Sequence, residues 1–242
     1  MSDCDLRCGD AFDLLASLPD GGVDCVIADP PYNEGTHANA VVRQRPNQLP
    51  IDFPPFTVED VSRLVCEAVR VARRWVVCFC PLEMLGDYKR AAHAIDERVW
   101  VRGGVWIKPD VLPQMSGDRP GQPGEGIAIM HRTGRKRWNR GGHPARWTFN
   151  VCHDDRVHSC QKPLDLMRAL VRDFTDPGEL ILDPFAGSGT TALACLVEGR
   201  RFLGCEVMPA THATALERLR AYREGQSLAA SRAGQTTLWG TP

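Results

Sequence analysis

The sequence lacks the usual features of a secreted or membrane protein. Its ten cysteines include no CxxC pair, and the charged start MSDCDLRCGD is not a secretory segment. No apolar run approaches the roughly 18 residues of a membrane span. Since reduced thiols are expected as well, we predict a cytoplasmic protein without a membrane partner.

A metal site has little support in the sequence. Cys152, His153, His158 and Cys160 could be drawn as a zinc site, but their spacing fits none of the common zinc-finger patterns. We therefore predict no metal, and we interpret these four side chains as incidental loop residues.

A strong net charge is also absent, because the formal net charge is −1 and 24% of the residues are charged. This balance excludes a disordered chain and a highly basic coat protein. The charges are nevertheless segregated. Residues 1–60 hold eleven acidic and three basic residues, which leaves 19 acidic and 26 basic residues in 61–242. Nucleic acid therefore stays open as a partner.

Short apolar runs alternate with helical patterns along the chain. The patterns predict strands at 5–8, 23–28, 74–80, 99–108, 126–132, 179–184 and 201–207, and helices at 11–17, around 61–69, at 164–174 and from Thr190. This alternation indicates an α/β fold with a doubly wound, mostly parallel sheet. The chain has room for one such domain, which we place at 1–224, with a flexible tail at 225–242. Residues 33–56 lack periodicity and are rich in Pro, Asn and Gln, which is typical of a lid or substrate loop.

The stretch ILDPFAGSGTTALACLVEGRRFLGCEV has the pattern of a strand, a glycine turn, a helix and a strand. Gly187 and Gly189 let a ligand approach the backbone, and Thr190 begins a helix whose N-terminus favours negative charge. Glu206 ends the next strand, where a carboxylate can bind both hydroxyls of a ribose. This pattern therefore predicts that the protein binds a cofactor that contains adenosine. The loop alone leaves NAD and S-adenosylmethionine open, and a tight turn for helix packing is the structural alternative.

The stretch VDCVIADPPYNEG ends a buried strand with Asp29 and continues with two prolines. Because proline donates no N–H, the Pro30 carbonyl can act as an acceptor beside the Asp29 carboxylate. Two such acceptors would favour the tetrahedral geometry that an exocyclic amino group needs to attack a methyl group on a sulfonium. Tyr32 adds a face on which a base can stack, contributing about 1–3 kcal/mol. Taken alone, DPPY could be a strand-ending turn, an interpretation that the glycine loop makes less favoured.

DPPY together with DPFAGSGTT resembles the amino-methyltransferases of DNA, and the circularly permuted order, with the catalytic motif first, resembles their β class. CGDAFDLLASLPDGGVDCVIADPPY, VWIKP and QKPLDLM support this resemblance over residues 5–207 in outline. It implies a Rossmann-like, S-adenosylmethionine-dependent methyltransferase fold and methyl transfer to adenine N6 or cytosine N4. DPPY rather than SPPY favours adenine. A target base in double-stranded DNA would have to be flipped out.

The resemblance also implies roles for individual residues. Asp29, Pro30 and Tyr32 would be catalytic. Asp183, Phe185, Gly187 and Gly189 would hold the methionine part of S-adenosylmethionine with Lys162 beside it, Glu206 would hold the ribose and Asp10 the adenine amino group, and Asp29 and Thr190 complete the predicted cofactor-binding set.

A basic segment lies between the two motifs, and residues 126–153 contain no acid. We predict that the segment 131–160 contacts DNA through Arg132, Arg135, Lys136, Arg137, Trp138 and Arg140. A solvated basic hairpin with tryptophans docked on the core is the alternative. The chain shows no large recognition domain. Three alternatives therefore stay open. The lid and this segment recognise a short site, the specificity is loose, or a second subunit in a homodimer contributes.

In the tail, Gln235, Leu238 and Trp239 resemble the short peptides that dock on sliding clamps, although a frayed terminus is the simpler interpretation. Other functions stay open too. The methyl acceptor could be cytosine N4, RNA or a protein amide, or the chain could be a nicotinamide-dependent oxidoreductase or a non-catalytic DNA-binding relative. The paired motifs favour a DNA adenine methyltransferase over all of these.

Overall fold

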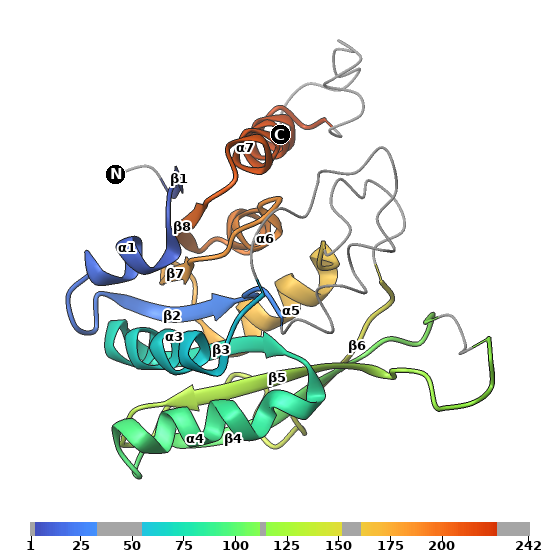
Figure 1. Cartoon of the computed structure of the whole chain (residues 1–242). Helices are drawn as coiled ribbons and strands as arrows, with labels where there is room; N and C mark the ends of the chain where they lie inside the picture. The colour runs from blue at the N-terminus through green and yellow to red at the C-terminus, as the bar shows by residue number, and fades with distance from the viewer. Residues whose placement is uncertain (1–2, 33–54, 112–114, 152–160, 227–242) are drawn as a thin grey trace.

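The computed structural model describes residues 3–32, 55–111, 115–151 and 161–226, which form one sheet with helices on both faces (Figure 1). The strands are β1 (Cys4–Cys8), β2 (Val23–Ala28), β3 (Ala72–Cys80), β4 (Trp100–Ile107), β5 (Gly124–His131), β6 (Arg146–Thr148), β7 (Leu180–Asp183) and β8 (Arg201–Glu206). The helices are α1 (Ala11–Ala16), α3 (Val58–Val71), α4 (Leu85–Ile95), α5 (Leu164–Phe174), α6 (Thr190–Val197) and α7 (Pro209–Arg223), with a short 3₁₀ turn η1 (Leu82–Met84).

The sheet is mostly parallel. Its strand order is β1-β8-β7-β2-β3-β5-β4-β6, and neighbouring strands are parallel except where β5 pairs with β3 and β4. The predicted doubly wound α/β fold is therefore confirmed. Because β1, β8, β7 and β2 are parallel neighbours, their carboxyl ends meet at one edge of the sheet, which is where ligands bind in such folds.

The central strands are buried on both faces. Along β2, Val26 and Ala28 join the core under α1, α3 and α4, whereas Cys25 and Ile27 join the core under α5, α6 and α7. All four side chains are fully buried. This two-sided burial explains why the strand is a continuous apolar run rather than an alternating one.

The N-terminus of α3 shows how the local sequence determines where a helix begins. Thr57 caps its N-terminus by accepting from the Asp60 N–H, and the Asp60 side chain bonds back to the Thr57 backbone. Behind this capping box, a stripe that includes Val61, Leu64 and Val65 is buried against the sheet. Burial of each such side chain contributes about 1.5–3 kcal/mol.

The predicted strands and helices are all present, with ends that differ by a few residues. Three further elements were not predicted. α4 was not recognised, β6 has only three residues, and α7 buries small or polar side chains such as Thr211, Thr214 and Ala215. Because α7 has no continuous apolar stripe, it gives little periodic signal in the sequence.

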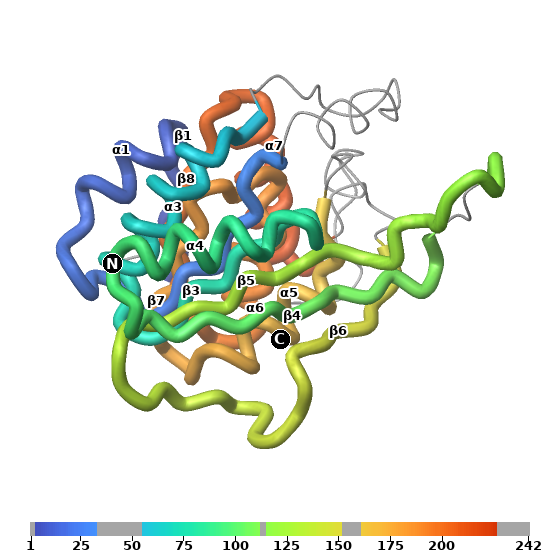
Figure 2. The backbone as a smooth tube through the Cα atoms, turned by 60° about the horizontal axis from the view of Figure 1, so that its bottom comes forward, coloured from blue at the N-terminus to red at the C-terminus, as the bar shows by residue number. Residues whose placement is uncertain are grey.

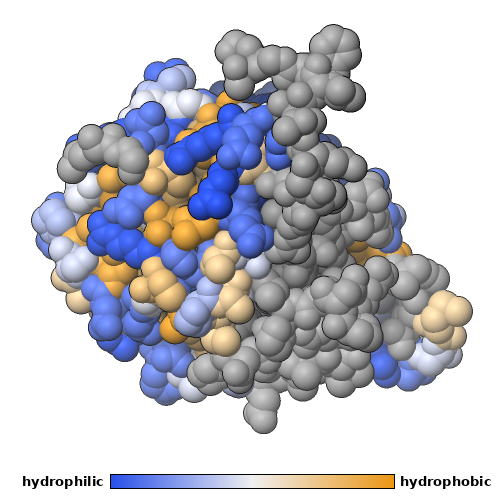
Figure 3. Space-filling model, turned by 90° about the horizontal axis from the view of Figure 1, so that it is seen from above, coloured by the Kyte–Doolittle hydropathy of each residue, from blue (hydrophilic) through white to orange (hydrophobic). Residues whose placement is uncertain are grey.

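The described part of the chain contains no helix that is both long and apolar enough to cross a membrane. In the view from above, hydrophobic residues on the described part of the surface are interrupted by hydrophilic ones (Figure 3).

Candidate active site

The two sequence motifs meet at the carboxyl edge of the sheet. Asp29 directly follows β2 and the glycine turn directly follows β7, its neighbour in the sheet. Val26 pairs with Leu182, so the segments that follow the two strands begin at the same edge of the sheet. The same edge carries the ends of β1 and β8, and the β4–β5 connection extends beyond it (Figure 2). Residues far apart in the sequence therefore form one site.

Asp29 is paired with Lys162, which lies just before α5. Lys162 Nζ donates to Asp29 Oδ2 at 2.6 Å, and the Tyr32 hydroxyl lies 3.2 Å from Asp29 Oδ1. The Lys162 ammonium also lies 4.9 Å from the ring centre of Phe79 and 5.4 Å from that of Tyr32. The Lys162 side chain is only 8% exposed, whereas Asp29 keeps 24% of its side-chain surface exposed. The Asp29 side chain is therefore the more exposed partner of this ion pair, and Lys162 is nearly enclosed.

Two further residues complete this cluster, and the sequence analysis did not identify either as a site residue. The Tyr32 hydroxyl donates to Glu125 Oε2 at 2.6 Å, and Lys162 Nζ lies 3.2 Å from the same oxygen. Lys108 Nζ donates to Glu125 Oε1 at 2.5 Å. Signals existed for both, since Lys108 lies in the VWIKP stretch and Glu125 is an acid next to a buried apolar run. We call Asp29, Tyr32, Lys108, Glu125 and Lys162 the charge cluster.

Charge and burial fix the protonation of these groups. Burial raises the pKa of Asp29 and Lys162 opposes this rise. Burial alone would also raise the pKa of Glu125, but Lys162 and Lys108 lower it to about 2. Burial and the two nearby carboxylates raise the pKa of Tyr32 well above its ordinary value. Near neutral pH, Glu125 is thus an anion and Tyr32 a neutral hydrogen-bond donor.

The two glycines of the turn after β7 have different structural roles. Gly187 has φ 51° and Gly189 has φ 80°, values that favour glycine. A Cβ added at Gly187 would meet only the Phe185 carbonyl oxygen, at 3.9 Å, whereas one at Gly189 would lie 3.1 Å from Ala215 Cβ of α7. Gly187 thus leaves room beside the backbone that a side chain would fill. Gly189 allows α6 and α7 to pack closely.

Asp183 and Thr190 anchor this turn. Asp183 accepts hydrogen bonds from the Phe185 N–H at 2.9 Å and from the Thr191 hydroxyl at 2.5 Å. Thr190 is buried at the start of α6, where Arg218 of α7 donates to its hydroxyl at 3.3 Å. Both predicted cofactor residues therefore also hold the turn in place.

Glu206 and Asp10 lie side by side at the ends of β8 and β1. Glu206 accepts from the Gly187 N–H at 3.0 Å and from the Met208 N–H at 2.8 Å, while burial raises its pKa. Asp10 caps α1 by accepting from the N–H groups of Phe12 and Asp13. The open backbone at Gly187 beside two oriented carboxylates fits S-adenosylmethionine, whose ribose and adenine offer donors to such groups.

The predicted DNA-contact segment starts at the opposite edge of the sheet. β5 is antiparallel to β3, so it carries the chain from the active-site edge to His131, at the amino ends of β2 and β3. Arg132, Arg135 and Lys136 follow His131 directly in the chain. The structure therefore does not bring these cations together with Asp29.

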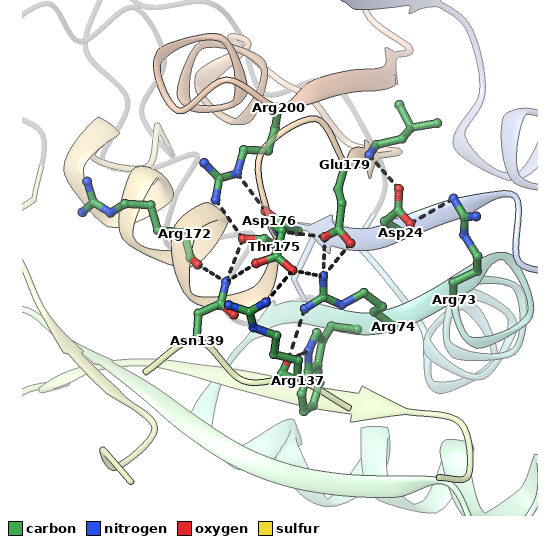
Figure 4. Close-up of polar contacts among 12 residues, drawn as sticks. Asp24, Arg73, Arg74, Arg137, Asn139, Arg172, Thr175, Asp176, Glu179 and Arg200 are labelled. Carbon is green, nitrogen blue, oxygen red and sulfur yellow. Dashed lines mark hydrogen bonds and ion pairs between the residues drawn. The ribbon is translucent and has the colours of Figure 1, made fainter. Parts of the chain in front are cut away.

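The next residues of this segment are fastened to the amino edge by an ion-pair network (Figure 4). Arg74 Nη1 lies 3.0 Å from Asp176 Oδ2 and 2.5 Å from Glu179 Oε1. Arg137 Nη1 lies 3.5 Å from the same Asp176 oxygen, and Asn139 Nδ2 donates to Asp176 Oδ1 at 3.2 Å. Arg137 and its neighbourhood thus have a structural role in addition to any contact with DNA.

Trp138 docks on the core rather than facing solvent. Its ring centre lies 5.1 Å from that of Phe174 and 6.2 Å from that of Trp147. Arg140 lies 5.7 Å from the Trp147 ring centre and 3.7 Å from Asp173. This packing agrees with the alternative in which the tryptophans belong to the core. Contact of the exposed cations with DNA stays a prediction.

Several predicted features fall wholly or mostly outside the described residues. These are residues 33–54 of the lid, the group Cys152, His153, His158 and Cys160, and the tail residues Gln235, Leu238 and Trp239. Within the described residues, no three His, Cys, Asp or Glu side chains are grouped so that they could hold a metal ion.

Asp183→Asn should change how stability depends on pH. Burial raises the pKa of Asp183 to about 7 in the folded protein, above the 3.8 of an ordinary carboxyl. The folded state therefore binds this proton more tightly, and that stabilisation is lost as pH rises through 7. We expect the free energy of unfolding of the variant, relative to the wild type, to increase by up to about 4 kcal/mol between acidic and mildly alkaline pH. Urea unfolding across this range measures it, and a pH-independent difference would contradict the prediction.

Comparison with known proteins agrees with the motif assignment. A family model described as DNA methylase, of the N6/N4 methyltransferase type, matches residues 23–217. The type II methyltransferase M.XycI of Xanthomonas campestris pv. cyanopsidis is 26% identical over 260 residues, covering 87% of this chain and 86% of the relative. M.Cfr9I of Citrobacter freundii, also a type II methyltransferase, is 26% identical over 257 residues with the same coverage.

Solved structures share the fold. The M1.HpyAVI–SAM complex has a TM-score of 0.65 at 23% identity and covers 89% of this chain and 99% of that one. The cytosine-N4-specific PvuII DNA methyltransferase has a TM-score of 0.67 at 16% identity, covering 89% and 86%. Because the family model spans both motifs and most of the chain, this protein belongs to the N6/N4 DNA methylase family and is an S-adenosylmethionine-dependent DNA amino-methyltransferase.

Proposed function

We propose that this chain methylates the N6 amino group of adenine in double-stranded DNA, with Asp29, Pro30 and Tyr32 as its catalytic residues. The observation that carries the proposal is the placement of an accessible Asp29 carboxylate beside the Tyr32 side chain, at the sheet edge that holds the glycine turn. The nicotinamide alternative loses its basis, because membership of the DNA methylase family accounts for both motifs.

The proposed roles follow from the electronic structure of the target. The lone pair of an exocyclic amine is delocalised into the ring, so the amine is a weak nucleophile. The Asp29 carboxylate and the Pro30 carbonyl would accept its two N–H groups and favour a tetrahedral nitrogen. The Tyr32 ring would stack on the base, which contributes about 1–3 kcal/mol. S-adenosylmethionine supplies a methyl group on a positively charged sulfur.

A strong base is not required. The target nitrogen becomes positively charged as it gains the methyl group, so its proton becomes acidic during the reaction. Asp29 therefore needs only to be an ionised acceptor, which Lys162 supports by pairing with its other oxygen at 2.6 Å. Since the amino group of a paired base is enclosed in the duplex, the base would be flipped out to reach Tyr32.

The cofactor would lie between the glycine turn and the ends of β1 and β8. Gly187 would let it approach the backbone, and Glu206, oriented by two backbone N–H groups, would accept from the ribose hydroxyls. Asp10 lies next to Glu206 and would accept from the adenine amino group. Phe185 follows Asp183 and Pro184 at this edge and would line the methionine part with Asp183.

Adenine is favoured over cytosine by Asp29 itself, because the family resemblance associates DPPY with adenine and SPPY with cytosine. Cytosine N4 is the second candidate, since the structurally similar PvuII enzyme is named as cytosine-N4-specific. Both bases present a conjugated exocyclic amine, and the same acceptors would serve either. The type II methyltransferases among the relatives support a site-specific enzyme.

Labelling with tritiated S-adenosylmethionine tests the proposed target. We expect unmethylated double-stranded DNA to yield labelled N6-methyl-2′-deoxyadenosine after digestion to nucleosides, and Asp29→Ala to abolish the label. Label in N4-methyl-2′-deoxycytidine would overturn the adenine assignment. Wild-type activity in the Asp29→Ala protein would overturn the catalytic role of Asp29.

A separate experiment tests whether the basic segment 131–160 contacts DNA. If it contacts phosphates, replacing Arg135, Lys136 and Arg137 together by Ala should flatten the dependence of log K on log salt concentration by about one unit per lost contact. The control removes the same charge from exposed positions on and after α4, with Lys89, Arg90 and Arg98 replaced by Ala. A slope equal to that of the control would remove the segment from the DNA interface.

A further inference from the structure

The Tyr32 hydroxyl has two carboxylates within reach and only one proton to donate. Its oxygen lies 2.6 Å from Glu125 Oε2 and 3.2 Å from Asp29 Oδ1. The shorter contact has the length of a strong charge-assisted hydrogen bond, and the longer one does not. Glu125 therefore receives the hydroxyl proton.

This choice decides what Asp29 can accept. Its Oδ2 is already paired with Lys162 at 2.6 Å, so Oδ1 is the oxygen that remains for an incoming N–H. If the Tyr32 hydroxyl turned to Asp29, it would donate to Oδ1, and a group of the protein itself would then occupy this acceptor. The target amine would then have to displace this donor before it could bind.

Glu125 is well placed to hold the hydroxyl because it is itself held rigidly. It is the second residue of β5 and pairs with Trp106 of β4. Lys108, just after β4, donates to its other oxygen at 2.5 Å and lies 4.3 Å from the Trp106 ring centre. The Lys108 backbone N–H also donates to the Pro123 carbonyl at 3.1 Å. Backbone pairing and a second ammonium thus fix the position of the carboxylate.

We propose that Glu125 is a positioning residue for methyl transfer. By accepting the Tyr32 hydroxyl and by contacting Lys162, it leaves Asp29 Oδ1 open to the N–H of the target amine. This inference rests on the proposed role of Asp29 and adds to it a residue that does not touch the substrate. A competing explanation is that Glu125 only neutralises two buried lysines.

Glu125→Gln separates the two explanations. In the carboxylate, Lys108 and the Tyr32 hydroxyl contact different oxygens, and an amide keeps an acceptor at only one of these two positions. When the Lys108 ammonium keeps the oxygen, the NH₂ group faces Tyr32 and the hydroxyl turns toward Asp29. We expect kcat to fall by a factor of the order of 10², with little change in the KM for S-adenosylmethionine. A purely structural role predicts a lower melting temperature with kcat retained in the folded fraction.

The pH profile supplies a second readout. The ionisable groups near Asp29 are Lys162, Tyr32, Glu125, Asp183 and, through Glu125, Lys108. Removing the Glu125 charge leaves an excess of positive charge, which lowers the pKa of Asp29. The acid limb of kcat should therefore move to lower pH in Glu125→Gln. In Lys108→Met, which removes a positive charge, it should move to higher pH, and this variant carries the test if the first does not fold.

A double-mutant cycle tests whether Glu125 acts through the hydroxyl. In a Tyr32→Phe background there is no hydroxyl to release, so Glu125→Gln should reduce kcat much less than it does in the wild type. The matched control is Glu179→Gln, a partly buried carboxylate paired with Arg74 at the opposite edge of the sheet. It should lower stability without moving the pH profile.

Three outcomes would overturn the inference. These are an unchanged kcat in Glu125→Gln, an equal loss in both backgrounds, or the same pH shift in the Glu179 control. None of them affects the proposed function, which fails instead if the wild type does not label adenine or if Asp29→Ala stays active.

Discussion

The Lys162 ammonium between two carboxylates is the interaction on which the rest of the site depends. Asp29 and Glu125 both contact Tyr32, and two carboxylates this close repel each other unless a cation compensates them. Lys162 comes from the segment before α5, Asp29 from the end of β2 and Glu125 from β5. A single buried charge therefore joins three parts of the chain at the sheet edge. Its removal would leave Asp29 without a cationic partner in a largely buried site, whereas Glu125 would keep its ion pair with Lys108.

The proposed catalytic residues and the structural ion-pair network lie at opposite edges of the sheet. The carboxyl edge holds the charge cluster and the glycine turn. The amino edge holds the network of Arg74, Asp176 and Glu179, which fastens the loop around Asn139 (Figure 4). The basic segment begins at this second edge, because antiparallel β5 carries the chain there, and most of its cations follow. A DNA molecule that delivers a base to Asp29 would have to extend around the sheet to meet them.

The fold shared with the PvuII enzyme, which is named as cytosine-N4-specific, does not identify the target base of this protein. The sheet fixes where an acceptor and a stacking ring can lie, and a few side chains at its edge decide what they accept. In the proposed reaction Asp29 would be the acceptor, and the charges of Lys162 and Glu125 act on its ionisation in opposite directions.

Local patterns in the sequence determined most of the strands, most of the helices and the two motifs, because apolar periodicity and glycine–proline chemistry act over a few residues. They also indicated the acid that ends β2 and the cofactor turn after β7. Glu125 and Lys108 were missed, and the location of the cations after His131 was not foreseen, since each depends on which strands pair and in which direction. Only the tertiary structure could decide these, because a long-range contact between charges leaves no periodic trace in the chain.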